Sequence, residues 1–126
     1  MMTNFNKVKE FHLKFGLTTN KICVKPTAEL ALFRSRLVVE ETAELVKALQ
    51  SENIPEIAKE LADILYVVYG TAVSLGIEIN EVFDEVHKSN MTKSPAKDAG
   101  GKVVKGDGYV PPDIEKALVE GLQRWL

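Results

Sequence analysis

Residues 36–77 read RLVVEETAELVKALQSENIPEIAKELADILYVVYGTAVSLGI. Apolar side chains recur every three or four residues on both sides of a short polar connection at 51–53, which is the spacing of amphipathic helices. No glycine or proline interrupts the first half, and Pro55 stands where the first turn of a helix tolerates proline. The pattern therefore predicts two long helices, and the short connection makes them antiparallel neighbours.

Helical spacing extends to both sides of this pair. Helices are predicted over residues 4–15, 27–50, 55–75, 80–91 and 113–124. Gly16 and Gly76 act as stop signals, and Thr27 and Asn80 have side chains that cap helix N-termini. We therefore expect an all-α fold, a bundle of four to five helices.

The C-terminal part of the sequence has a different character. Residues 93–112 hold four glycines and three prolines, which predicts an irregular loop, with a small hairpin at 102–105. Residues 113–126 are predicted to form a C-terminal helix. We expect the whole chain, residues 1–126, to be a single domain.

The composition is that of an ordinary globular domain. Of the 126 residues, 45% are hydrophobic and 27% are charged, and the formal net charge is −2. This balance argues against a protein held to nucleic acid mainly by phosphate contacts, and no apolar run reaches the roughly 20 residues that cross a membrane. A lone Cys23 and an N-terminus without the apolar core of a signal peptide lead us to expect a cytoplasmic protein.

Five acidic residues follow the pattern E-E-x-x-E and then E-x-x-D: Glu40, Glu41, Glu44, Glu60 and Asp63. Residues three apart lie on the same face of a helix. Apolar residues project beside Glu41 and Glu60, so these carboxylates are predicted to lie near the interface of the two long helices. Glu40 lies at the edge of that apolar sector, and Arg36, one turn before it, has the spacing of a plain helix ion pair.

Crowded carboxylates in a poorly solvated place raise one another's pKa and need a compensating cation. Lys47 and Lys59 are predicted to project to the outer faces of their helices, which leaves a divalent metal. Oxygen ligands select hard cations, so Mg²⁺ or Mn²⁺ is favoured, and Mg²⁺ binds together with substrate phosphates. The set has enough ligands for two or more ions. Because E-x-x-E also arises on ordinary solvated helices, the spacing alone leaves a surface role open.

Three segments, RLVVEETAELVKAL, EIAKELADILYVVYGTAVSLGI and VFDEVHKSNMTK, together resemble the MazG-like all-α nucleoside triphosphate pyrophosphohydrolase superfamily. That superfamily includes phosphoribosyl-ATP pyrophosphohydrolase and the dimeric dUTPases. The resemblance implies a metal site made of Glu41, Glu44, Glu60 and Asp63. It also implies that Glu40 orients or deprotonates the attacking water, and that Asn90 and Lys93 contact the nucleotide or its phosphates.

The resemblance implies hydrolysis of nucleoside or deoxynucleoside triphosphates to monophosphates and pyrophosphate, a chemistry that removes damaged or surplus nucleotides. It further implies a homodimer or homotetramer with sites at subunit interfaces, in which Trp125 and Leu126 find cover. Two alternatives stay open. One is phosphoribosyl-ATP pyrophosphohydrolase activity, and the other is a helical oligomer that binds a nucleotide without turnover.

Other motifs give weaker indications. The Asp84-x-x-His87 pair is like half of a di-iron site, which needs two Glu-x-x-His pairs. His12 stands among phenylalanines and is interpreted as a core histidine. The glycines at 100–101 lack the earlier glycine that a P-loop requires, which favours a surface loop.

Overall fold

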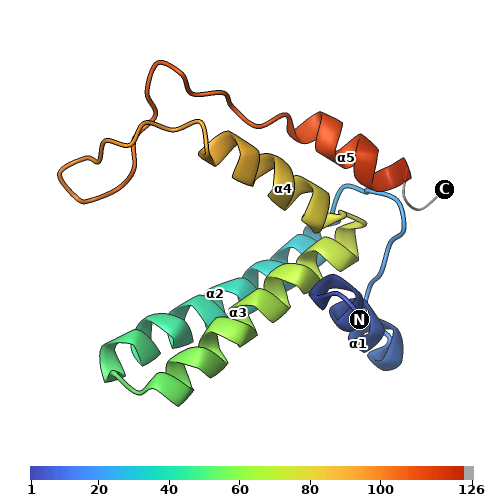
Figure 1. Cartoon of the computed structure of the whole chain (residues 1–126). Coiled ribbons are helices and arrows are strands. Elements are labelled where there is room, and N and C mark those ends of the chain that lie inside the picture. Colours follow the sequence, from blue (N-terminus) through green and yellow to red (C-terminus); the bar gives the residue numbers. More distant parts are fainter. Residues whose placement is uncertain (124–126) are drawn as a thin grey trace. The chain divides into compact units, whose positions relative to one another are not determined.

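The computed structural model describes residues 1–123, and this part of the chain contains five helices and no strand (Figure 1). The helices are α1 (Asn4–Phe15), α2 (Ala28–Ser51), α3 (Ile54–Leu75), α4 (Ile79–Asn90) and α5 (Ile114–Gln123). The all-α prediction is confirmed, while the predicted tail of Trp125 and Leu126 lies outside the described residues. No single described helix is long and apolar enough to cross a membrane, although α3 and α4 reach that length and composition as a bent pair.

The chain divides into two compact units, Met1–Ile77 and Glu78–Leu126. The first unit contains α1, α2 and α3, and the second contains α4 and α5. All five residues of the acidic pattern therefore belong to the first unit, whereas Asn90 and Lys93 belong to the second.

An antiparallel hairpin of α2 and α3 forms most of the first unit (Figure 1). Thr27 caps α2, because its Oγ1 accepts a hydrogen bond from Leu30 N–H at 3.1 Å. Between the helices Glu52 adopts a left-handed conformation with φ 59°, and Asn53 Oδ1 then accepts the Glu56 N–H at 3.1 Å. The predicted helix pair and its short connection are confirmed, and they bring the middle of α2 opposite the first half of α3.

The loop at 17–25 closes the C-terminal end of α3. Gly76 ends this helix with φ 69°, in the left-handed region that glycine adopts without strain. Asn20 N–H donates to Val73 O at 3.1 Å, and Val24 N–H donates to Leu75 O at 2.9 Å. The last carbonyls of α3 thus find partners in the loop, which holds it against the helix.

The packing of α1 on α3 forms the apolar core of the first unit. Phe5 and Val8 of α1 are buried, as are Ala72 and Val73 of α3. His12 is 2% exposed, and its Nδ1 lies 2.9 Å from Thr18 O. A carbonyl only accepts, so Nδ1 donates the proton. His12 is therefore a core residue with a satisfied ring nitrogen, as predicted.

The second unit corrects two sequence predictions. Asn80 is not the cap of α4: Glu78 is, and its Oε1 accepts the Asn80 N–H at 3.1 Å, because the helix begins at Ile79. The hairpin predicted at 102–105 is larger in the structure and begins earlier. Lys97 pairs with Val103 across a turn at residues 98–101. Gly101 has φ 86° in that turn, in the region of backbone conformation that favours glycine. The two paired segments lie on either side of the turn.

Candidate metal site

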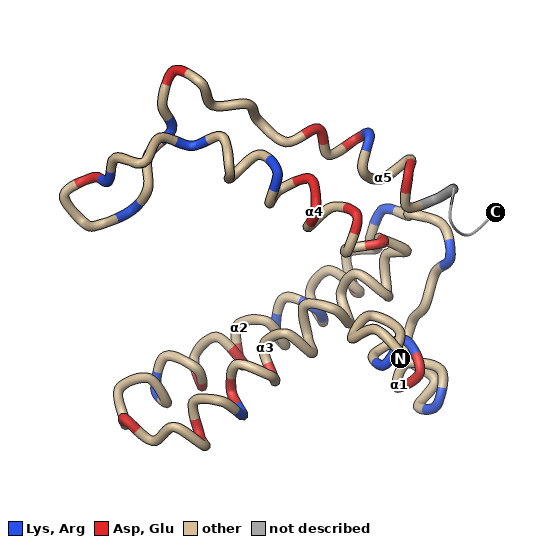
Figure 2. The backbone as a smooth tube through the Cα atoms, in the orientation of Figure 1, with Lys and Arg blue, Asp and Glu red and all other residues tan. Residues whose placement is uncertain are grey.

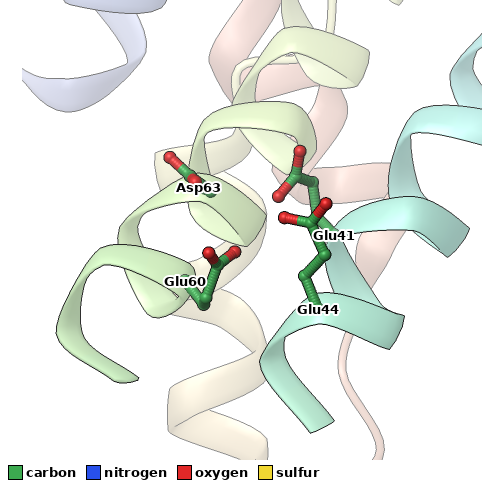
Figure 3. A group of neighbouring side chains, drawn as sticks. All are labelled: Glu41, Glu44, Glu60 and Asp63. Carbon is green, nitrogen blue, oxygen red and sulfur yellow. The ribbon is translucent and has the colours of Figure 1, made fainter. Parts of the chain in front are cut away.

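Four carboxylates meet across the α2–α3 hairpin, two from each helix (Figure 3). They are Glu41, Glu44, Glu60 and Asp63, and one oxygen from each lies within 4.8 Å of the others. Acidic positions occur on both arms of the hairpin (Figure 2). The i, i+3 spacing turns both members of each pair to the same face of their helix, so an antiparallel hairpin in this register makes all four converge.

Two oxygens of this cluster are buried and unsatisfied. Glu60 is 8% exposed and Glu41 is half-buried. Neither Glu41 Oε2 nor Glu60 Oε2 has a hydrogen-bond partner in the described part of the chain. An unsatisfied buried polar atom costs about 1–3 kcal/mol, and a charged one costs more. Hard, oxygen-only donors with free lone pairs fit a divalent cation such as Mg²⁺ or Mn²⁺.

The two carboxyl groups of α2, Glu41 and Glu44, have raised pKa values. Burial, followed by the nearby charge of Glu44, raises the pKa of Glu41 above its ordinary value. A hydrogen bond with the Glu60 carboxyl, followed by its charge, raises the pKa of Glu44. Like charges at close range contribute to both shifts, and a bound cation would offset this contribution.

The prediction that Lys59 projects away from the acidic residues is wrong. Its Nζ lies 2.7 Å from Asp63 Oδ2 and 3.4 Å from Glu60 Oε1, because Asp63 stands one helical turn further along the same face. These carboxylates raise the pKa of Lys59. The side chain of Lys59 is nevertheless 68% exposed, so water screens the interaction. One screened ammonium leaves the charge of four carboxylates largely uncompensated.

Glu40 directly precedes Glu41 on α2 and is exposed. It is not among the four converging side chains. The ion pair expected between Arg36 and Glu40 does not form within the described residues, where both side chains extend into solvent. Among residues 1–123, no cation is paired with the Glu40 carboxylate.

Asn90 and Lys93 lie together at the end of α4. Asn90 is the last residue of the helix and is exposed, and its carbonyl accepts a hydrogen bond from Lys93 N–H at 3.1 Å. Lys93 is half-buried in the turn that follows. Their contact with a nucleotide stays a prediction.

Sequence reasoning missed one charged residue of the hairpin, Arg34, which is only 5% exposed. The sequence did hold a signal for it. Arg34 begins a series on α2 that continues with Val38, Glu41, Leu45 and Ala48 at alternating steps of four and three, the spacing of a buried stripe.

Glu44→Gln is expected to raise the melting temperature of the metal-free protein at neutral pH. A carboxyl whose pKa is raised by folding opposes folding once it ionises. The penalty is absent below the ordinary pKa of glutamate and grows as the pH rises through the raised pKa of Glu44. Thermal unfolding in EDTA at several pH values measures the gain.

Adding Mn²⁺ should stabilise the wild type more than the Glu44→Gln variant. The order of their melting temperatures should therefore reverse. Glu29→Gln, an exposed change on the same helix, is the control and should bring no gain in EDTA. A Glu44→Gln protein less stable than wild type in EDTA would show that the four acids do not repel one another.

Comparisons with known proteins place the acidic residues inside a matched family region. A family model described as "Phosphoribosyl-ATP pyrophosphohydrolase" matches residues 8–90. An uncharacterized protein of Acanthamoeba polyphaga mimivirus is 35% identical over 122 residues, which cover 92% of this chain and 48% of that protein. The chain thus spans about half the length of this relative. The family match includes the five acidic residues and Asn90, and it ends before Lys93.

Proposed function

Because the chain belongs to the phosphoribosyl-ATP pyrophosphohydrolase family, we propose that it hydrolyses a nucleoside or deoxynucleoside triphosphate between the α and β phosphates. The products are a nucleoside monophosphate and pyrophosphate. One observation carries the proposal: four carboxylates converge across α2 and α3, and two of their buried oxygens lack partners in the described residues. Such a set suits a reaction in which polyphosphate charge must be held and neutralised.

Glu41, Glu44, Glu60 and Asp63 would hold two or more Mg²⁺ or Mn²⁺ ions. Bound there, divalent ions supply Lewis acidity to phosphoryl oxygens and lower the pKa of coordinated water. The protein itself holds the carboxylates in place on two helices, and the side chain of Glu60 is buried between its neighbours. A site on helices keeps its geometry more precisely than one on loops.

Glu40 is proposed as the general base. It lies on the same helix as Glu41 and Glu44, directly before Glu41 in the sequence, and its exposed carboxylate is accessible to water. Glu40 takes a proton from the attacking water as the water oxygen bonds to the α phosphorus. The bond from that phosphorus to the bridging oxygen breaks, and pyrophosphate leaves with the bond electrons.

Glu40→Gln is expected to lower kcat by about 10²- to 10⁴-fold, the usual contribution of general base catalysis, and to leave Mn²⁺ affinity unchanged. Steady-state pyrophosphate release and Mn²⁺ titration measure the two effects separately. A parallel loss of Mn²⁺ binding would instead make Glu40 a metal ligand. Arg36→Gln, exposed one turn away on the same helix, is the matched control and should keep its activity.

We also propose that the chain assembles as a homodimer or homotetramer. The α2–α3 hairpin leaves large apolar side chains exposed, among them Val39 at 68%, Leu61 at 47% and Leu65 at 51%. Apolar surface of this kind marks an interaction site. Replacing Leu61 and Leu65 together by lysine should convert an oligomer into a monomer by light scattering, whereas Glu56→Lys on the same helix should not. A wild type that is already monomeric would overturn this proposal.

A pyrophosphate-release panel tests the proposed activity. Common and modified nucleoside triphosphates are assayed with Mg²⁺ and Mn²⁺ beside phosphoribosyl-ATP, the substrate that the family description favours as a second candidate. Turnover of triphosphates supports the proposal, and turnover of phosphoribosyl-ATP alone supports the second candidate. Release of pyrophosphate from no substrate would favour a helical oligomer that binds a nucleotide without hydrolysing it.

A further inference from the structure

An open pocket of about 420 Å³ lies in the first unit, between α2 and the C-terminal half of α3. Its walls are mostly apolar, with Leu30, Ala31 and Val38 from α2 and Leu75 from α3. Arg34 also lines it. Ser35 and Thr71 are its other polar lining residues. The volume and the mostly apolar lining with a few polar groups are those of a small-molecule site.

Arg34 carries a buried positive charge without an anionic partner. Its Nε donates to Thr71 Oγ1 at 3.1 Å and its Nη2 donates to Val67 O at 2.9 Å. Both acceptors are neutral. Within the described part of the chain, Nη1 has no hydrogen-bond partner and no carboxylate pairs with the guanidinium. A buried guanidinium keeps its charge, and its burial is costly unless all of its donors find acceptors.

The surroundings of Arg34 fix its position and add no negative charge. A Cβ at Gly70 would collide with Arg34 Nη2 and lie 3.0 Å from His12 Nε2, so only glycine lets both side chains lie against α3 here. Burial lowers the pKa of His12, which favours the neutral form of its ring. Two hydrogen bonds thus hold Arg34 in the pocket wall, and neither of them uses Nη1.

The pocket adjoins the acidic cluster along the same two helices. Val38, which lines the pocket, stands three residues before Glu41 and so lies on the same face, one turn away. Arg34 precedes Glu41 by seven residues, a rise of about 10 Å along α2. A ligand with phosphates at the acidic cluster can therefore lay its other end in the pocket.

We propose that this pocket binds the nucleobase, and that Arg34 Nη1 selects bases with a keto oxygen on the edge furthest from the sugar. This inference rests on the proposed function, which places the phosphates at the four carboxylates. The sugar then faces the cluster, and the far edge of the base faces Arg34. That edge carries O4 in uracil and thymine, and O6 in guanine and hypoxanthine.

The chemistry of Arg34 sets the direction of the preference. A guanidinium only donates hydrogen bonds. A keto oxygen accepts from Nη1, whereas the amino group of cytosine or adenine presents hydrogens to it and cannot accept this bond. A hydrogen bond to a charged group is strong enough to give a preference of about 10- to 100-fold in kcat/KM.

Matched substrate pairs test the proposal. The pairs are dUTP against dCTP and dITP against dATP, because each pair differs mainly in one keto or amino group. We expect the keto member of each pair to have a kcat/KM about 10- to 100-fold higher. Arg34→Gln should bring both ratios close to one, because a glutamine amide both donates and accepts. Circular dichroism verifies that the variant is folded.

A second variant avoids touching the buried charge. Ala31→Leu fills part of the pocket from a helical position and should raise KM for all four nucleotides while Mn²⁺ affinity stays unchanged. Binding of deoxyuridine and deoxycytidine to the metal-free wild type, followed by NMR, gives a readout independent of catalysis. Deoxyuridine should bind more tightly, and Ala31→Leu should weaken it.

The outcomes separate this inference from the function on which it rests. Absence of pyrophosphate release from every nucleotide contradicts the proposed function, while the nucleoside titration still tests the pocket. Turnover with equal kcat/KM within each pair overturns the base pocket alone. An Arg34→Gln variant that loses activity equally on all four substrates, with unchanged ratios, would place Arg34 on a phosphate and also overturn the inference.

Discussion

Replacing Glu60 by glutamine is expected to lower kcat/KM for pyrophosphate release by about a hundredfold to a thousandfold. Glu60 is 8% exposed, and its Oε2 has no partner in the described residues. Glutamine keeps the shape of the side chain and removes the charge. Metal-based charge stabilisation contributes several kcal/mol to such reactions, and each 1.4 kcal/mol corresponds to about a tenfold change in rate.

Glu56→Gln is the matched control for this prediction. Glu56 lies on α3 one turn before Glu60 and is exposed. Its hydrogen bond to Asn53 Oδ1 is donated by the backbone N–H, which the substitution does not change. The same chemical change there should leave activity within about twofold of wild type, since surface substitutions have small effects. A folded Glu60→Gln protein with wild-type activity would contradict the assignment of Glu60 to the metal site.

Gly76→Ala is expected to destabilise the fold by about 2–5 kcal/mol, the sum of a left-handed alanine and an overpacked contact. Gly76 has φ 69°, and a Cβ there would collide with the Ile22 carbonyl group and lie 3.0 Å from Asn20 O. The loop is tied to α3 by the Val24 N–H bond to Leu75 O, so it yields only by losing such bonds. Urea unfolding followed by circular dichroism measures the loss.

Gly16→Ala separates the two causes. Gly16 ends α1 with φ 68°, nearly the backbone conformation of Gly76, but a Cβ there meets nothing within 4 Å. Its cost should be limited to the strain of a left-handed alanine, about 1–2 kcal/mol. Equal losses from the two substitutions would mean that the contact between Gly76 and the loop adds nothing to stability.

The sequence was sufficient for the features that depend on periodicity and local capping. The long helices of the hairpin follow from uninterrupted apolar spacing, and Thr27, Gly16 and Gly76 are caps because their backbone and side-chain chemistry is local. Convergence of the four carboxylates also follows from short-range facts. Each pair is spaced i, i+3, and the short connection forces the two pairs to face each other.

Features that depend on how a long side chain bends were predicted less well. The projection of Lys59 on a helical wheel places its Cα on the outer face, yet four methylenes carry its Nζ to Asp63. Asn80 is a residue type that often caps helices, but α4 begins one residue before it, and Glu78 Oε1 accepts the Asn80 N–H. Arg34 was missed although it lies in the apolar stripe of α2, because the room for its guanidinium depends on a glycine 36 residues later, Gly70.

The most direct test of the metal site is a titration of Mn²⁺ into the metal-free protein, followed by electron paramagnetic resonance. We predict saturable uptake of two or more ions per chain by the wild type and by Glu56→Gln. The double variant Glu41→Gln with Glu60→Gln, which removes the charge of both carboxylates that have buried and unpaired oxygens, should lose this uptake. Unchanged uptake by a folded double variant, or no saturable uptake by the wild type, would contradict the account.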